Sequence, residues 1–312
     1  MHMRTKEKPY NTLNNYYQLR YGQKVFKIAL NGDFTCPNKD GSKGTGGCIY
    51  CSESGSGDFA GNKTFSLNDQ FQNIKQMMQK KWKNGLYIAY FQANTNTYKD
   101  VETLRTLFEE ALSLEPKIIG LSIATRCDAL DDAKYDLLEE LSKKTHLQIE
   151  LGLQSIHQET ALWMNRGHDL QCFTDAVNEL RKRNIDVVVH IINGFPNETP
   201  NMMLETSNFL NNLDIQGIKI HMLHVMKKTA LGHLYAKEPF NLLTLDEYRD
   251  IVVKQITHLK EDIIIHRLTG DSPTDQLIAP LWTKKKFIVM NEIDKYMRAN
   301  KLHQAIYYNQ KE

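Results

Sequence analysis

The 312-residue sequence has few cysteines and no long apolar run. Its five cysteines are an odd number, which argues against the paired disulfide framework of a secreted domain. The longest apolar runs, such as residues 186–195, are shorter than the roughly 18 residues that a membrane helix needs. The first residues also lack the apolar core of a signal peptide. We therefore expect a protein without membrane segments, located in the reducing cytoplasm.

The net charge of +2 is also small, but the charged residues are distributed unevenly along the chain. Residues 1–27 carry six basic residues against one acidic residue, and residues 283–301 carry six against two. Tyrosines are interleaved with the basic residues of the first segment, and this combination would suit a phosphate backbone and unstacked bases. Solvated lysine-rich surfaces would produce the same pattern, and on charge alone they are the better explanation.

Short β-branched or aromatic runs alternate with amphipathic stretches along the chain. The runs predict seven strands, at residues 24–30, 86–92, 117–124, 147–153, 186–193, 217–225 and 262–268. Apolar spacings of three and four predict helical faces formed by Phe71, Ile74, Met78 and Trp82; by Leu104, Leu107, Phe108, Ala111 and Leu112; by Leu137, Leu138 and Leu141; and by Phe173, Val177 and Leu180. Repeated βα units with apolar strands predict one α/β domain with a parallel sheet. Six or seven units fit an open or incomplete barrel, with ligands at the carboxyl ends of the strands.

Three of the five cysteines lie in a glycine-rich loop directly after the first predicted strand. Cys36, Cys48 and Cys51 have the spacing C-x11-C-x2-C. A structural zinc site needs four protein ligands, so zinc here would also require Cys127 or a histidine. A cubane iron–sulfur cluster held by three thiolates instead leaves one iron open to a substrate or cofactor. Cys127 and Cys172, taken alone, are expected to be small buried residues. The loop glycines allow positive φ values around a bulky cluster, at positions 41, 44, 46, 47, 55, 57 and 61.

The end of this motif, C-x-aromatic-C with Tyr50 as the aromatic residue, resembles the radical S-adenosylmethionine (SAM) superfamily. The long first gap resembles the branch that contains the Elongator catalytic subunit, and within it a stand-alone bacterial family of the YtqA and YhcC type. Six further segments resemble that branch in chain order, at residues 122–128, 150–155, 164–168, 190–199, 218–231 and 266–271. The resemblance implies a partial (β/α)6-type barrel of parallel strands. It implies a core over residues 24–270, between a basic N-terminal extension (1–23) and a basic C-terminal extension (271–312) packed on the core.

The resemblance also implies the cofactors. Cys36, Cys48 and Cys51 would hold a [4Fe–4S] cluster, and the amino and carboxylate groups of SAM would bind the open iron. An electron from a low-potential donor such as flavodoxin or ferredoxin would then cleave SAM to methionine and a 5′-deoxyadenosyl radical. The protein would supply position, electrostatics and exclusion of side reactions.

Individual SAM contacts follow from comparison with the oxygen-independent coproporphyrinogen oxidase type. Gln154 matches a glutamine after a strand. Arg166 matches an arginine on the following helix and would pair with the SAM carboxylate through two parallel hydrogen bonds. His190 stands where that relative has an aspartate, beside the ribose. Asn94 and Thr95 stand where relatives carry a glycine-rich turn that meets the methionyl amino group.

Other candidate positions have more than one explanation. Tyr50 would lie beside the adenine or pack under the loop. Arg126 would address substrate or pair with Asp128. Polar residues near the ends of later strands would face the substrate side, although each also has a surface explanation: His221, His224, Lys227, His266 and Arg267.

The resemblance implies a transfer RNA (tRNA) substrate. The stand-alone bacterial family is associated with conversion of 5-carboxymethylaminomethyl(-2-thio)uridine at the wobble position to 5-aminomethyl(-2-thio)uridine. Hydrogen abstraction beside the nitrogen would give a stabilised radical, whose further oxidation would release the two-carbon fragment. Two alternatives remain: a radical SAM enzyme acting on a peptide or small metabolite, and a non-catalytic zinc or iron–sulfur RNA-binding module.

Overall fold

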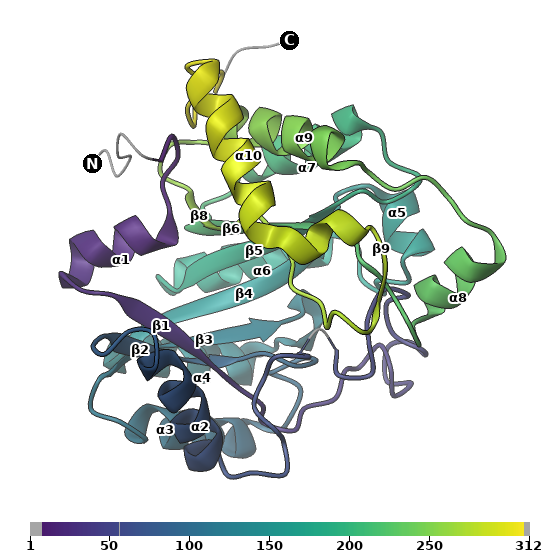
Figure 1. Ribbon diagram of the computed structural model, residues 1–312. Coiled ribbons are helices and arrows are strands. Elements are labelled where there is room, and N and C mark those ends of the chain that lie inside the picture. Colours follow the sequence, from purple (N-terminus) through teal and green to yellow (C-terminus); the bar gives the residue numbers. More distant parts are fainter. Residues whose placement is uncertain (1–7, 56, 309–312) are drawn as a thin grey trace.

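Seven parallel strands form a curled half-barrel sheet in the computed structural model, which describes residues 8–55 and 57–308 (Figure 1). In chain order the strands are β1 (Val25–Leu30), β2 (Leu86–Phe91), β3 (Ile118–Thr125), β4 (His146–Gln154), β5 (Asp186–Asn193), β6 (Gly217–Met222) and β8 (Ile264–Arg267). Each strand pairs in parallel with the one before it in the sheet, so the strand order never reverses as it does in a doubly wound sheet. The predicted α/β class and partial barrel are confirmed. Arg4 and Lys6 of the basic N-terminal segment lie outside the described residues.

Helices connect successive strands, and most of them pack against the sheet. The connecting helices are α2 (Leu67–Gln79), α3 (Val101–Ser113), α4 (Asp132–Lys144), α5 (Gln158–Trp163), α6 (Leu170–Lys182), α7 (Pro200–Leu210), α8 (Ala230–Lys237) and α9 (Leu245–His258), with a 3-10 turn η1 (Cys127–Ala129). The predicted apolar faces of α3, α4 and α6 pack in the main core. Trp82 is the exception, because α2 ends at Gln79. Its ring packs 5.4 Å from that of Phe26, with the Lys24 ammonium 4.1 Å above it.

The strand predicted over residues 217–225 is too long. Strand β6 ends at Met222, and Val225–Met226 form a separate strand β7. Strand β7 pairs in the antiparallel sense with β9 (Leu277–Ala279). The apolar pattern continues through residue 225 because β7 is buried as well, so periodicity alone does not show where the chain leaves the barrel sheet.

Helix α1 (Leu13–Tyr21) packs against both edge strands, β1 and β8. The preceding segment runs beside β8, where the Ile265 backbone N–H donates to the Asn11 carbonyl at 2.8 Å. The C-terminal helix α10 (Lys286–Ala299) follows the 3-10 turn η2 (Leu281–Lys285). The Tyr10 hydroxyl donates a hydrogen bond of 2.8 Å to Asp294 of this helix. The two terminal segments therefore contact each other near the edge strand β8. Among the helices of residues 8–308 that are described, none combines the length and apolar character needed to cross a membrane.

Candidate functional site

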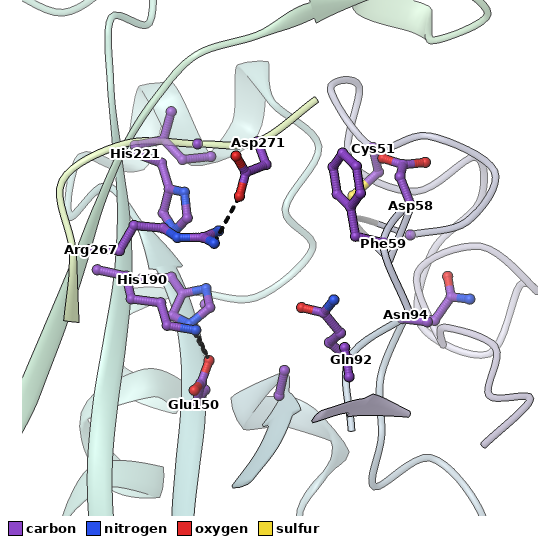
Figure 2. Close-up of a pocket in the computed structure, with 18 of the residues that line it drawn as sticks. Cys51, Asp58, Phe59, Gln92, Asn94, Glu150, His190, His221, Arg267 and Asp271 are labelled. Carbon is purple, nitrogen blue, oxygen red and sulfur yellow. Dashed lines mark hydrogen bonds and ion pairs between the residues drawn. The ribbon is translucent and has the colours of Figure 1, made fainter. Parts of the chain in front are cut away.

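A cavity of about 800 Å³ lies within the half-barrel, bordered by the cysteine loop and the carboxyl ends of the strands (Figure 2). It brings together all nine cofactor residues predicted from the sequence: Cys36, Cys48, Tyr50, Cys51, Asn94, Thr95, Gln154, Arg166 and His190. Five of the six additional candidates also line it: Arg126, His221, His224, His266 and Arg267. Lys227 is exposed and does not line the cavity.

The cysteine loop is held by hydrogen bonds with the segment after α5. Ile49 N–H donates to the Met164 carbonyl at 3.0 Å, and the Asn165 side-chain amide donates to the Gly47 carbonyl at 2.8 Å. Gly47 has a φ of 73°, a conformation that a residue with a Cβ rarely adopts. The positive φ values that the loop glycines allow occur at glycines 41, 46, 47 and 55.

The environment of Cys48 favours its thiolate form. A hydrogen bond with Cys51, followed by the charge of Arg126, lowers the pKa of the Cys48 thiol to about 6 although burial opposes this shift. The Asn38 side-chain amide also points to Cys48 Sγ at 3.9 Å. Arg126 makes the predicted ion pair with Asp128, with two contacts of 2.9 and 2.8 Å, while still lining the cavity. Because thiolates are the ligands of iron–sulfur clusters, this donor set fits a cluster.

The remaining two cysteines do not join this group. Cys127 and Cys172 contact each other, with their sulfur atoms 3.4 Å apart, and neither lines the cavity. Over the described part of the chain, no group of three or more histidine, cysteine or acidic side chains is arranged to hold a single metal ion. A tetrahedral zinc site needs such a group, whereas a cubane distributes its thiolates over different irons. Cys36, Cys48 and Cys51, which line the cavity, are therefore the candidate cluster ligands, and Cys127 and Cys172 are not.

Three non-glycine residues of the cavity wall have strained backbones. Gln154 at the end of β4 has a φ of 68°, and Ala93 and Asn94 after β2 have φ values of 134° and 59°. The second turn stands where relatives are expected to carry glycines, and it keeps a glycine-type conformation without them. Asn94 is fixed by a 2.9 Å hydrogen bond to the Phe34 carbonyl, and Thr95 N–H donates to the Thr35 carbonyl at 3.1 Å. Such strain is concentrated at functional sites.

Substitution of Gln154 separates backbone strain from side-chain function. We expect Gln154→Gly to be more stable than Gln154→Ala by about 1 kcal/mol, because only glycine adopts a positive φ without steric cost. Both variants lack the amide, so both should bind SAM more weakly than the wild type. Urea unfolding and equilibrium dialysis with SAM measure the two effects. Equal stability of the two variants would contradict the strain.

Arg166 is positioned differently from the prediction. It lies beyond the end of α5, not on a helix, and its side chain is buried at 1% exposure. Its Nη1 donates to the carbonyls of Leu153 and Ser155 at 2.5 and 2.6 Å, and its Nε donates to the His168 carbonyl at 3.1 Å. Within the described residues Nη2 is buried without a hydrogen-bond partner. The guanidinium can therefore offer Nη2 to a ligand, while its other nitrogens hold the turn around the cavity.

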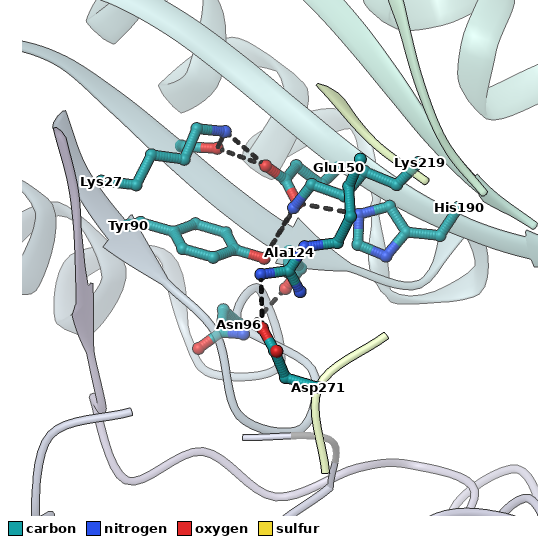
Figure 3. Close-up of polar contacts among 10 residues, drawn as sticks. Lys27, Tyr90, Asn96, Ala124, Glu150, His190, Lys219 and Asp271 are labelled. Carbon is teal, nitrogen blue, oxygen red and sulfur yellow. Dashed lines mark hydrogen bonds and ion pairs between the residues drawn. The ribbon is translucent and has the colours of Figure 1, made fainter. Parts of the chain in front are cut away.

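A buried charge cluster on the cavity floor was missed by the sequence reasoning (Figure 3). Glu150 on β4 is 1% exposed and forms ion pairs with Lys27 of β1, at 2.5 Å, and with Lys219 of β6. Tyr90 of β2 donates to the same carboxylate at 2.9 Å. Burial alone would raise the pKa of Glu150, but the charges of Lys219 and Lys27 hold it well below its usual value. A charged residue at the centre of an apolar strand is the signal that could have identified this cluster, because buried charges require partners.

His190 belongs to this floor. Its Nε2 lies 2.8 Å from the Glu150 carboxylate, and its ring centroid is 5.4 Å from that of His221. Burial, followed by the charge of Lys219, lowers the pKa of His190. Burial also lowers the pKa of Lys219 to about 7. In the structure His190 is a hydrogen-bond partner of Glu150. The contact with the SAM ribose that the resemblance implies for His190 remains a prediction.

Comparisons with known proteins agree with this architecture. Residues 41–210 match the radical SAM superfamily, and residues 215–299 match the radical SAM C-terminal domain. The chain is 47% identical over 306 residues to YtqA of Bacillus subtilis, covering 98% of this chain and 95% of that protein. It is 34% identical over 279 residues to YhcC of Escherichia coli, covering 89% of each.

More distant matches cover a smaller share of the matched protein. The tRNA-2-methylthio-N6-dimethylallyladenosine synthase of Clostridium botulinum is 28% identical over 172 residues, which are 53% of this chain and 37% of that enzyme. The solved structure of archaeal Elp3 from Methanocaldococcus infernus has a TM-score of 0.67 at 15% identity and covers 90% of this chain. This chain spans 64% of that structure, so the likeness extends to the shared fold.

Proposed function

The chain belongs to the radical SAM superfamily, and on that premise we propose that it modifies the wobble uridine of tRNA. Members of the family use a [4Fe–4S] cluster and SAM, so the chain is a radical SAM enzyme. The proposed reaction converts 5-carboxymethylaminomethyl(-2-thio)uridine to 5-aminomethyl(-2-thio)uridine. It would take place in the cytoplasm, with electrons from a donor such as flavodoxin or ferredoxin.

One observation supports the proposal most: the three cysteines, the candidate SAM contacts and a charged floor line the same cavity. Cys36, Cys48 and Cys51 would hold the cluster. Gln154 and Arg166 would bind SAM, and Arg166 has Nη2 left for this purpose. The other predicted contacts, Tyr50, Asn94, Thr95 and His190, border the same space.

The cavity rim suits an unstacked base. Phe59 lines the cavity yet is 56% exposed, and it lies across from His221 and Arg267 (Figure 2). RNA-binding proteins stack splayed bases on exposed aromatic rings of this kind. Helix α1, which carries part of the basic N-terminal segment, also borders the cavity through Leu13 and Tyr17. A cavity of about 800 Å³ falls within the usual range of ligand pockets.

The chemistry requires an oxidation that the family cofactors can support. When bound, the cluster and SAM would supply a 5′-deoxyadenosyl radical able to abstract a hydrogen atom from a carbon of the substrate. Removal of the carboxymethyl group is a two-electron oxidation in which water enters and the two-carbon fragment leaves as an aldehyde. Cleavage of SAM to methionine and 5′-deoxyadenosine would take up these two electrons, so the external donor would supply only the electron that first reduces the cluster. The buried cavity wall would exclude water until the substrate carbon is in place.

Nucleoside analysis tests the substrate. We expect tRNA from a deletion strain to accumulate the carboxymethylaminomethyl nucleoside. Anaerobic holoenzyme with reductant and SAM should convert that tRNA to the aminomethyl form, with one 5′-deoxyadenosine formed per product. An unchanged nucleoside profile in the deletion strain would reject the assignment. SAM cleavage without any effect of tRNA would favour a peptide or metabolite substrate, and absence of SAM cleavage would favour a non-catalytic RNA-binding module.

A further inference from the structure

The cavity floor carries an excess of positive charge. Lys27 and Lys219 both pair with the single carboxylate of Glu150 (Figure 3). Both lysine side chains are largely buried, with exposures of 16% and 10%. Buried charges are costly unless they are paired, so when Lys219 is protonated two ammonium groups share one carboxylate and one positive charge has no protein anion of its own.

No other acidic side chain among the described cavity residues compensates this charge. Asp58 lies on the cysteine loop and is exposed. Asp271 is already paired with Arg267 of β8 and with Lys286 of α10, at 2.8 and 2.9 Å. The other groups that surround the floor are hydroxyls, imidazoles and a guanidinium: Tyr90 of β2, Ser122 of β3, His190 of β5, His221 of β6, and His266 and Arg267 of β8.

The same floor has hydrogen-bonding atoms without protein partners. Within the described ranges, His221 Nε2 and His266 Nδ1 are buried and make no hydrogen bond. Burial is the main cause that lowers the pKa of both imidazoles well below the usual value, and nearby cations add to it. The rings are therefore neutral and can donate to a ligand without adding charge. Buried polar atoms of this kind are normally satisfied, which indicates that a ligand completes the floor.

We propose that this floor binds the carboxylate of the substrate's carboxymethylamino group, with Lys219 as the residue that determines specificity. The inference rests on the proposed function. A carboxylate placed here would balance the second ammonium group and accept a charge-assisted hydrogen bond from Lys219. A nucleoside without the carboxylate would leave the lysine charge unbalanced, so it would be bound less well.

A pair of matched RNAs tests the subsite. One is an anticodon stem-loop carrying 5-carboxymethylaminomethyluridine, and the other carries the primary amide of the same group, which has the same shape without the charge. We expect wild-type holoenzyme to bind the carboxylate RNA more tightly by on the order of 10-fold to 100-fold. Lys219→Met should remove this preference by weakening only the carboxylate RNA. Fluorescence anisotropy measures the four dissociation constants.

Matched controls separate this effect from misfolding. Lys219→Met leaves Glu150 paired with Lys27, and its fold is checked by urea unfolding and by iron–sulfur loading, both of which report on the folded protein apart from substrate binding. Lys219→Arg should retain part of the preference for the carboxylate. Lys227→Met removes an exposed lysine outside the cavity, and it should behave as the wild type.

Each contrary result has a distinct meaning. If the wild type binds both RNAs equally but still converts tRNA, the subsite is wrong and the proposed function stands. Reduced SAM cleavage by Lys219→Met without RNA would assign the floor to the carboxylate of SAM itself and overturn the inference. Failure of the wild type to convert the carboxylate RNA would refute the proposed function, and the inference with it.

Discussion

Alanine in place of Cys36, Cys48 or Cys51 is expected to abolish iron–sulfur loading and to reduce SAM cleavage to background. All three thiols line one cavity, and the surroundings of Cys48 already favour its thiolate. A cubane with three protein ligands has no spare thiolate, so loss of any one leaves a second iron without protein support. Iron and acid-labile sulfide assays on anaerobically reconstituted protein measure loading, and formation of 5′-deoxyadenosine measures cleavage.

The remaining cysteines provide a control within the same chain. Cys172→Ala removes a thiol that contacts Cys127 and does not line the cavity. This variant should bind as much iron and sulfide as the wild type and should cleave SAM at a similar rate. Full iron loading of a Cys48→Ala variant, or loss of the cluster from Cys172→Ala, would show that the ligands have been assigned to the wrong cysteines.

The sheet was predictable because each of its strands is a separate apolar run. The seven runs assemble in parallel in chain order, and the cavity lies at their carboxyl ends, as in other α/β folds. Boundaries were less predictable where buried segments continue past the end of an element. The segment after Met222 is apolar because it packs in a second small sheet, and Trp82 is partly buried by Phe26 although α2 has ended. Apolar periodicity indicates that a residue is buried, but it does not indicate which part of the chain covers that residue.

The cysteine loop was identified from its sequence because its residues are local to one segment. The charged floor was not, although Lys27, Glu150 and Lys219 each stand in an otherwise apolar strand. Their contact depends on three strands from distant parts of the chain curling around one interior, which no local pattern reports. The same limit applies to Arg166, whose Nη1 donates to carbonyls of the preceding turn while Nη2 has no partner among the described residues. Sequence comparison indicates that a residue borders the site, whereas the backbone decides which of its atoms remain available.

Glu150→Gln is expected to destabilise the fold by about 3 kcal/mol, because it leaves two buried ammonium groups without their carboxylate. Tyr90 and His190 also lose a charged acceptor. The cost should lie at the lower end of the range for broken buried ion pairs, since Lys219 can release its proton. Urea unfolding of the wild type and variant under the same conditions measures the difference in the free energy of unfolding.

The loss of stability in Glu150→Gln is expected to depend on pH, because Lys219 changes its protonation state near neutral pH. Its pKa is about 7 in the folded protein, below the usual value for lysine, and loss of Glu150 removes the charge that raises it, so the variant has a still lower pKa. At pH 8 the lysine is mostly neutral in both folded proteins. At pH 6 Lys219 of the folded wild type is mostly protonated, as it is in the unfolded chain. In the folded variant Lys219 still binds fewer protons than in the unfolded chain, so the variant continues to lose stability as the pH falls. The loss of stability should therefore be larger at pH 6 than at pH 8.

Glu292→Gln, which breaks an exposed pair with Lys295, should cost less than about 1 kcal/mol at either pH. A deficit that does not change between the two pH values would show that Lys219 is not the group that responds to Glu150.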